Sequence, residues 1–329
     1  MNYDLKYMQR CIQLARCGAA GAPPNPMVGA VIVHDDKIIG EGYHRRCGGP
    51  HAEVNAIRSV CDESLLKEST IYVSLEPCSH YGKTPPCADL IIEKQIPRVV
   101  VGCMDPFAKV NGQGIKKLRD AGIEVVVGVM EKDCMELNKR FITFHQQHRP
   151  YVTLKWAQSE DGFMDVERKE GEEPFKFSSN FTQALVHQMR ATHQAIMVGT
   201  KTVLMDNPTL TTRLWEGPNP LRVTIDRKGV LPESVHLKDG KVPTVIYNTG
   251  DLNQILDDLY KRGIQTLMVE GGSRLLHAFI DAGLWDETRV EIAPIVLRGG
   301  VPAPVLKEEN LKTELSVDNR KILNYRREM

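Results

Sequence analysis

Two short stretches of the sequence carry the residue types that zinc prefers. His51 precedes Glu53 by two positions, and Cys78 and Cys87 follow, nine positions apart. An imidazole and two thiolates suit zinc, and a set of three protein ligands leaves one position open for water. Bound zinc lowers the pKa of water from ~15.7 toward ~7. The pattern therefore predicts a hydrolytic metal site.

Glu53 is the candidate for proton transfer at this site. A carboxylate that does not bind the metal can take a proton from water and pass it to a leaving amine. Zinc deaminases carry His-x-Glu followed by Pro-Cys-x-x-Cys, and this sequence matches that pattern except for its longer cysteine spacing. A structural zinc with a fourth ligand from His80 or Cys47 is therefore the alternative. Such a closed site would hold no reactive water.

The predicted elements place these residues at the ends of helices and strands. His51 and Glu53 lie in the first turn of a predicted helix. Cys78 follows an alternating strand, and Cys87 opens the next helix, whose N-terminus favours a thiolate. Strands alternate with helices, which predicts a three-layer α/β/α domain. The predicted strands are 28–33, 70–75, 98–102 and 123–127.

Composition limits the class of protein. The 329 residues suffice for two domains, and 42 basic against 42 acidic residues give zero net charge. A neutral chain has no basic excess for holding a nucleic acid. No apolar run could span a membrane and the start lacks a signal core, so a cytoplasmic protein is expected. Free thiols are then expected, with five as small core residues: Cys11, Cys17, Cys61, Cys103 and Cys134.

The second half repeats the α/β pattern without the zinc motif. The apolar pattern lapses around 144–150, which predicts domains 1–148 and 149–329. The segment 269–273 joins a strand to a helix through two glycines, and such a turn lets a phosphate approach backbone N–H groups. Two glycines also serve ordinary tight turns. The expected strands are 151–155, 195–199, 221–226, 244–247, 266–270 and 289–296, with helices at 182–192 and 273–283.

These motifs resemble those of a known family. The run 76–87, with 51–53, 105–106 and 111–112, closely resembles the deaminase half of the bifunctional riboflavin-biosynthesis family, which shares the longer cysteine spacing. Its members are diaminohydroxyphosphoribosylaminopyrimidine deaminases and 5-amino-6-(5-phosphoribosylamino)uracil reductases. The segment 200–213 resembles the family's reductase. The resemblance implies a cytidine-deaminase-like N-terminal domain and a dihydrofolate-reductase-like C-terminal α/β domain.

The resemblance also implies roles for individual residues. In the first half it implies one zinc ion held by His51, Cys78 and Cys87, catalysis by Glu53, and substrate binding by Asn25, His44, His80, Lys83 and Asn111. In the second half it implies substrate binding by Arg190, Leu210, Arg213 and Glu270. It implies NADPH binding by Lys155, Gln158, Thr202, Asp206, Gly272, Ser273, Arg274, Leu275, Leu276, His277 and Ala278. Pro174 and Lys176 stand where the family has a serine and a tryptophan, and those two roles are not transferred.

The expected function is a pair of successive reactions. The first is hydrolytic, zinc-dependent deamination of 2,5-diamino-6-(5-phosphoribosylamino)pyrimidin-4(3H)-one. The second is NADPH-dependent reduction of the ribosyl group, giving 5-amino-6-(5-phosphoribitylamino)uracil. A homo-oligomer acting on small molecules is expected. The alternatives are a deaminase with an inactive reductase-like domain, a nucleic-acid base editor, and a non-catalytic zinc-stabilised binding module.

Overall fold

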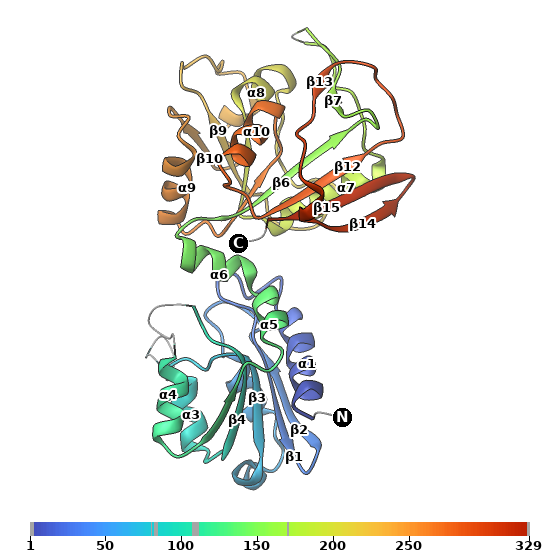
Figure 1. The fold of residues 1–329 in the computed structure, drawn as a ribbon. Coiled ribbons are helices and arrows are strands. Elements are labelled where there is room, and N and C mark those ends of the chain that lie inside the picture. Colours follow the sequence, from blue (N-terminus) through green and yellow to red (C-terminus); the bar gives the residue numbers. More distant parts are fainter. Residues whose placement is uncertain (1–2, 80, 82–84, 107–111, 170, 328–329) are drawn as a thin grey trace. The chain divides into compact units, whose positions relative to one another are not determined.

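The chain divides into two compact units, Met1–Gln147 and His148–Met329. The computed structural model describes residues 3–79, 81, 85–106, 112–169 and 171–327. Each unit is built on its own central sheet (Figure 1). Among the described residues, no helix is both long enough and apolar enough to cross a lipid bilayer.

The first unit contains a five-stranded sheet in the order β2-β1-β3-β4-β5. β1 pairs antiparallel with β2 and β3, whereas β3, β4 and β5 run parallel. The central strands are apolar almost throughout, because a sheet covered on both faces has no side that can be polar. The strands are β1 (Gly29–His34), β2 (Lys37–Tyr43), β3 (Thr70–Leu75), β4 (Arg98–Cys103) and β5 (Glu124–Val127).

Helices pack on both faces of this sheet (Figure 1). Ile71 and Val73 of β3 face α2, α3 and α4, whereas Tyr72 between them faces α1 and α5. This alternation follows from the two-residue period of a strand. The predicted three-layer arrangement is therefore confirmed. The helices are α1 (Tyr3–Arg16), α2 (Ala52–Arg58), α3 (Cys87–Glu93), α4 (Gln113–Asp120), α5 (Glu131–Leu137) and α6 (Lys139–Gln147), with a 3₁₀ turn at Glu63–Glu68.

The second unit contains an eight-stranded sheet in the order β10-β9-β8-β11-β6-β12-β15-β14. It is parallel from β10 to β12, and β15 and β14 add an antiparallel edge. The strands are β6 (Tyr151–Gln158), β8 (Ala195–Val198), β9 (Leu221–Ile225), β10 (Thr244–Tyr247), β11 (Thr266–Val269), β12 (Glu287–Ile292), β14 (Leu311–Val317) and β15 (Arg320–Arg326). A separate pair joins β7 (Phe163–Asp165) to β13 (Val301–Pro302).

Its main apolar core lies between this sheet and the helices α9 and α10. The helices are α7 (Asn180–Thr192), α8 (Thr200–Asp206), α9 (Leu252–Lys261) and α10 (Ser273–Asp281), with 3₁₀ turns at His236–Lys238 and Glu308–Asn310. Neither α9 nor the β14–β15 hairpin was predicted from the sequence. The helix had a readable signal, since Leu252, Ile255, Leu256 and Leu259 form a buried stripe. β14 had none, because its residues are mostly exposed.

The cysteines agree only in part with expectation. All eight are free thiols, as predicted. Cys11, Cys103 and Cys134 are buried, but Cys17 and Cys61 are exposed, so their assignment to the core was wrong. Both follow the end of a helix, α1 and α2, where the chain has already turned toward solvent.

Candidate functional site

The structure brings His51, Cys78 and Cys87 together in the first unit. Their ligand atoms all lie within 4.8 Å of one another. The His51 Nδ1 atom is 3.5 Å from the Cys78 Sγ and 3.3 Å from the Cys87 Sγ. Cys78 follows β3 and Cys87 opens α3, as the sequence predicted, and His51 immediately precedes α2 instead of lying in its first turn.

This donor set fits zinc. Zinc binds thiolate sulfur at ~2.3 Å and imidazole nitrogen at ~2.0–2.1 Å, so a tetrahedral site separates such ligand atoms by about 3.6 Å. The two measured separations, 3.5 and 3.3 Å, are close to that value. The Cys87 backbone N–H also donates to the Cys78 Sγ at 3.3 Å, which favours its thiolate form. The hydrogen bonds from Cys87 and His51 lower the pKa of the Cys78 thiol.

The alternative of a closed four-ligand site receives no support from Cys47. Within the described part of the chain, the metal-ligand cluster holds only the three predicted residues, and Cys47 is exposed and outside it. His80, the other candidate for a fourth ligand, lies outside the described residues.

Glu53 is buried beside the cluster without being one of its three members. Its side chain is only 3% exposed and interacts with the Cys87 thiol. Burial first, and then the negative charge of Cys78, raise the pKa of the Glu53 carboxyl to about 7. The site therefore presents a carboxyl group in position to exchange protons with a molecule bound next to the cluster.

Asn25 and His44 meet next to the metal ligands. The Asn25 side-chain nitrogen lies 3.1 Å from His44 Nε2, and the other ring nitrogen of His44 lies 3.1 Å from the Pro50 carbonyl oxygen. The rings of His44 and His51 are 5.4 Å apart, edge to face. Burial lowers the pKa of His44, which favours a neutral ring that accepts a hydrogen bond from Asn25. Of the other predicted substrate residues, Lys83 and Asn111 lie outside the described residues, like His80.

Glu76, which was not singled out from the sequence, ties this site to the start of α4. Its carboxylate accepts hydrogen bonds from the backbone N–H groups of Asp105 (3.2 Å), Gly112 (2.9 Å), Gly114 (2.9 Å) and Ile115 (3.3 Å). A Cβ on Gly114 would lie 2.0 Å from the Pro77 carbonyl oxygen, so only glycine permits this approach. The start of α4 is thereby held against the segment that carries Cys78.

Replacing Glu76 with alanine should destabilise the first unit by about 3 kcal/mol or more, because buried N–H groups would lose their acceptor at ~1–3 kcal/mol each. Denaturant unfolding followed by a probe in that unit measures the change. Glu68→Ala, which removes an exposed carboxylate, is the matched control and should shift stability by less than ~0.5 kcal/mol. Equal stabilities of the two variants would show that Glu76 has no such role.

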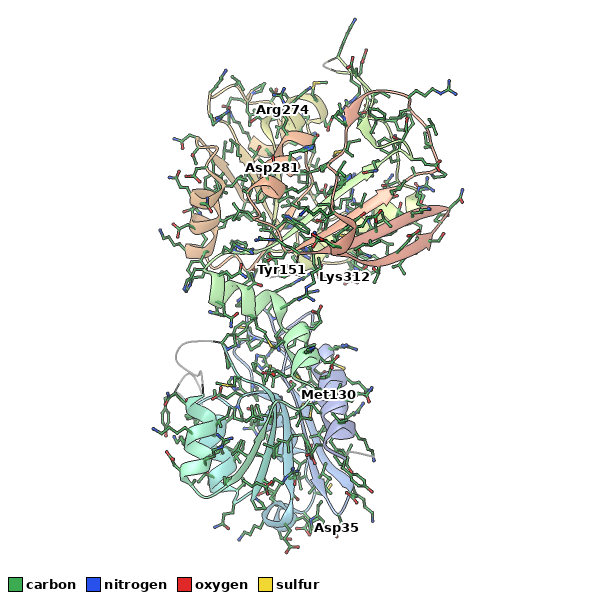
Figure 2. All side chains as sticks on the ribbon, viewed as in Figure 1. Asp35, Met130, Tyr151, Arg274, Asp281 and Lys312 are labelled. Carbon is green, nitrogen blue, oxygen red and sulfur yellow. The ribbon has the colours of Figure 1, made fainter. Side chains whose placement is uncertain are left out.

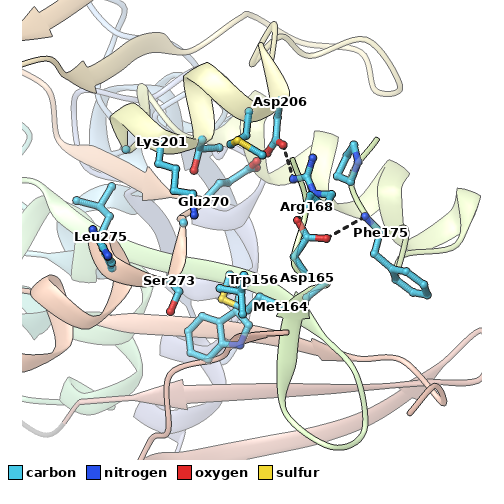
Figure 3. Close-up of a pocket in the computed structure, with 18 of the residues that line it drawn as sticks. Trp156, Met164, Asp165, Arg168, Phe175, Lys201, Asp206, Glu270, Ser273 and Leu275 are labelled. Carbon is cyan, nitrogen blue, oxygen red and sulfur yellow. Dashed lines mark hydrogen bonds and ion pairs between the residues drawn. The ribbon is translucent and has the colours of Figure 1, made fainter. Parts of the chain in front are cut away.

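The second unit contains an open cavity of about 1200 Å³ (Figure 3). Its walls come from the carboxyl ends of β6, β8, β9 and β11, from the N-termini of α8 and α10, and from the β7–α7 segment. Ligands commonly bind at the carboxyl ends of parallel strands. Of the predicted cofactor and substrate residues, those that line it are Lys155, Thr202, Asp206, Glu270, Gly272, Ser273, Arg274, Leu275 and Ala278.

Glu270 and Arg190 form a buried ion pair at this cavity. Arg190 donates to the two Glu270 carboxylate oxygens at 3.1 and 2.7 Å, and both side chains are about nine-tenths buried. Burial alone would raise the pKa of Glu270, but the Arg190 and Lys155 cations outweigh it and lower the pKa to about 2. Burial lowers the pKa of Lys155. The pair thus keeps a fixed carboxylate in the wall of the cavity.

Asp206 is bound to an arginine that the sequence did not single out. Arg168 pairs with Asp206 at 2.6 Å and with Asp165 at 2.6 Å, and Phe175 N–H donates to Asp165 at 3.2 Å (Figure 3). The changed loop 173–177, whose cofactor role was left open, lines the cavity through its residues 174–177. Arg168 therefore connects this loop to α8. Its positive charge also neutralises the Asp206 carboxylate.

The glycine turn and α10 follow β11 as predicted. Gly272 caps α10, and Arg274 lies at its N-terminal end with Asp281 at the other (Figure 2). A Cβ on Gly272 would lie 3.2 Å from the Thr202 hydroxyl oxygen, so α8 and α10 present adjacent N-termini. Leu276 and His277 do not line the cavity: Leu276 is fully buried in the core, and the His277 ring contacts Ser273.

Three further predicted residues do not line the cavity. Gln158 does not line the cavity; its side chain accepts a hydrogen bond from the Trp156 indole at 2.7 Å. Leu210 is buried with a positive φ of 53°, a strained conformation of the kind that concentrates at functional sites. Arg213 is exposed, and its backbone N–H donates to His187 Nδ1 at 3.0 Å. Burial, then the Arg190 and Arg213 cations, lower the pKa of His187 to about 4.

Two family models match the chain. Residues 1–103 match the cytidine and deoxycytidylate deaminase zinc-binding region, and residues 150–329 match the RibD C-terminal domain. The "Riboflavin biosynthesis protein RibD" of Aquifex aeolicus is 38% identical over 98% of this chain and 95% of the relative. That of Escherichia coli is 36% identical over 89% of this chain and 88% of the relative.

Solved structures agree with these matches. The diaminohydroxyphosphoribosylaminopyrimidine deaminase/5-amino-6-(5-phosphoribosylamino)uracil reductase of Thermotoga maritima is similar with a TM-score of 0.86 and 36% identity, covering 98% of each chain. An Acinetobacter baumannii RibD structure is similar with a TM-score of 0.86 and 33% identity, again over 98% of each chain. The similarity thus spans both units and not one alone.

Proposed function

From the premise that this chain belongs to the RibD family of riboflavin-biosynthesis enzymes, we propose which of its residues carry the two activities. The chain is a bifunctional enzyme, a zinc-dependent deaminase and an NADPH-dependent reductase. The single observation that supports the site assignment best is the convergence of His51, Cys78 and Cys87 on one point with Glu53 buried beside them. The assignment of 1–148 to deamination and 149–329 to reduction stays a prediction.

In the first unit, His51, Cys78 and Cys87 would hold zinc. When bound, zinc lowers the pKa of water, which makes a nucleophile available at neutral pH. Glu53 accepts the proton of the attacking water and delivers it to the amino group that leaves C2 as ammonia. Asn25 would hold the pyrimidine edge through its amide oxygen, and the neutral His44 ring orients Asn25 by accepting from its amide nitrogen. The expected substrate is 2,5-diamino-6-(5-phosphoribosylamino)pyrimidin-4(3H)-one.

In the second unit, the N-termini of α8 and α10 would hold the dinucleotide. Gly272 and Ser273 line the cavity at the positive end of α10, where the backbone N–H groups of a first helical turn suit a pyrophosphate. NADPH supplies the hydride that opens the ribosyl group at C1. Arg190, Arg213 and Glu270 orient the ribotide. Arg190 is already paired with Glu270, so the Arg213 guanidinium is the group that suits the phosphate.

Two assays test this proposal together. The purified chain should release ammonia from the diaminopyrimidine ribotide without NADPH, and should then oxidise NADPH when given the deaminated product. Ammonia release without NADPH oxidation would support the alternative of an inactive reductase-like unit. Salt-sensitive binding to RNA would revive a base editor, against which the zero net charge argues. Cytoplasmic localisation and a homo-oligomeric state stay predictions, the latter measurable by light scattering.

Arg213→Ala should raise the KM of the reductase for the phosphorylated ribotide by roughly 10- to 100-fold, because a charge-assisted contact is worth ~1.5–3 kcal/mol. Since phosphate binding is the same in the ground and transition states, kcat should change little. Steady-state NADPH oxidation measures both constants. Arg262→Ala removes an exposed arginine of α9 that pairs with Asp258, and it is the control. A fall in kcat at constant KM would argue against this role of Arg213.

A further inference from the structure

The cavity of the second unit carries positive charge that the protein does not neutralise. Arg168 is paired with Asp165 and Asp206, and Lys155 lies beside Glu270. Four further cations on its lining make no hydrogen bond or ion pair with any residue that the structure describes: Lys176, Lys201, Arg227 and Arg274. One unpaired acid on the lining, Glu167, opposes them. In a chain of zero net charge, this excess indicates a ligand with several negative charges.

Arg227 lies two residues beyond β9, at the carboxyl end of the strand. In the sheet β9 neighbours β8, and β8 neighbours β11, which leads into α10. Adjacent strands lie ~4.8 Å apart, so β9 ends roughly 10 Å from the turn proposed to hold the pyrophosphate. That is about the reach from a pyrophosphate to the far side of the adenosine ribose. Arg227 therefore lies within the length of one nucleotide from that turn, on the lining of the same cavity.

The carboxylate of Asp226, the residue before Arg227, already accepts hydrogen bonds from the protein. In Rossmann-type sites, a carboxylate binds the ribose 2′-hydroxyl of NADH, whereas a nearby arginine accommodates the 2′-phosphate of NADPH. Asp226 accepts hydrogen bonds from the backbone N–H groups of Val230 at 2.9 Å and Leu231 at 3.0 Å, and it is only 8% exposed. The Asp226 carboxylate therefore stabilises the turn after β9. Arg227, and not Asp226, lines the cavity.

A glycine makes room for the Arg227 side chain at the rim. A Cβ on Gly250 would lie 3.3 Å from the Arg227 Cδ, 3.5 Å from its Nη1 and 3.6 Å from its Nε. The guanidinium group therefore runs along the backbone just before α9, and both residues line the cavity. A larger residue at 250 would displace it.

We propose that Arg227 binds the 2′-phosphate of NADPH and thereby makes the reductase half select NADPH over NADH. The inference rests on the proposed nucleotide site and adds to it the residue that distinguishes the two dinucleotides. The guanidinium fork can donate two hydrogen bonds to one phosphate. Arg274 cannot discriminate from the N-terminus of α10, because a pyrophosphate is common to both dinucleotides.

Equilibrium binding to the full chain tests the inference without catalysis. The Kd values for NADPH and for NADH are measured by fluorescence titration at one fixed ionic strength. Arg227→Ala should weaken NADPH binding by roughly 10- to 100-fold, the effect of losing a charge-assisted phosphate contact, and change the Kd for NADH less than about twofold. Lys228→Ala, the neighbouring exposed cation that does not line the cavity, should change neither Kd. Unchanged thermal midpoints show that both variants fold.

Several results would overturn the inference. Equal weakening of both dinucleotides by Arg227→Ala would mean that the arginine acts on a part they share, and no weakening would mean that it does not contact NADPH. If Lys201→Ala, and not Arg227→Ala, weakened the binding of NADPH alone, the 2′-phosphate would be assigned to α8. Each of these leaves the nucleotide site itself intact. A wild-type chain that binds neither dinucleotide would instead overturn the proposed function of the second unit.

Discussion

Glu53→Gln should reduce ammonia release by about 10²- to 10⁴-fold, the range that general acid–base catalysis contributes. Glutamine keeps the size of the buried side chain but cannot accept and return a proton. The zinc content should stay at the wild-type level, because Glu53 is not one of the three residues whose ligand atoms converge. Ammonia release under saturating substrate, with zinc measured on the same sample, gives the comparison.

The matched control for this variant is Glu68→Gln, which removes an exposed carboxylate in the same unit. It should retain full ammonia release. Glu53→Gln should also leave NADPH oxidation unchanged when the deaminated intermediate is supplied, since the second unit has its own core. Ammonia release within a few-fold of wild type would remove Glu53 from the mechanism.

Cys78→Ala should abolish both zinc binding and ammonia release, because two remaining ligands cannot hold the ion in a tetrahedral site. Reduction of the deaminated intermediate should persist. Chelation of the wild-type protein should give the same pattern, and activity should return when zinc is added back. Metal analysis and the two separate assays measure these outcomes.

Cys47→Ala is the control that addresses the closed-site alternative. Cys47 is exposed and outside the cluster, so its loss should leave zinc and ammonia release intact. If Cys47→Ala lost zinc as Cys78→Ala does, the site would have a fourth protein ligand. The ion would then be structural, and no position would remain for water.

The metal site could be predicted from the sequence because its three ligands lie at the ends of helices and strands, which have local sequence signals. His51 at the start of a helix, Cys78 after a strand and Cys87 at the next helix start are each fixed by patterns a few residues long. Glu76 was not readable. Its four backbone partners lie 29 to 39 residues away, and no local motif says where an acidic side chain will find buried N–H groups.

The second site depended more on tertiary structure. The glycine turn before α10 was predicted as a local feature, but the pairing of Arg190 with Glu270 joins residues 80 positions apart. Arg168 was missed because its partner Asp206 lies on another element, 38 residues along the chain. Gln158 is predicted to bind the cofactor, and its hydrogen bond from the Trp156 indole was not readable from the sequence.

The sequence by itself determined the ligand types, the elements that carry them, the two α/β units and the membership of the family. Tertiary structure decided which charges stay unpaired. Strands β9, β8 and β11 are neighbours in the order 9-8-11, and chain order does not reveal this. Since a side chain's partners depend on which strand ends meet, only the folded sheet could show that Asp206 is neutralised while Arg227 has no partner among the described residues.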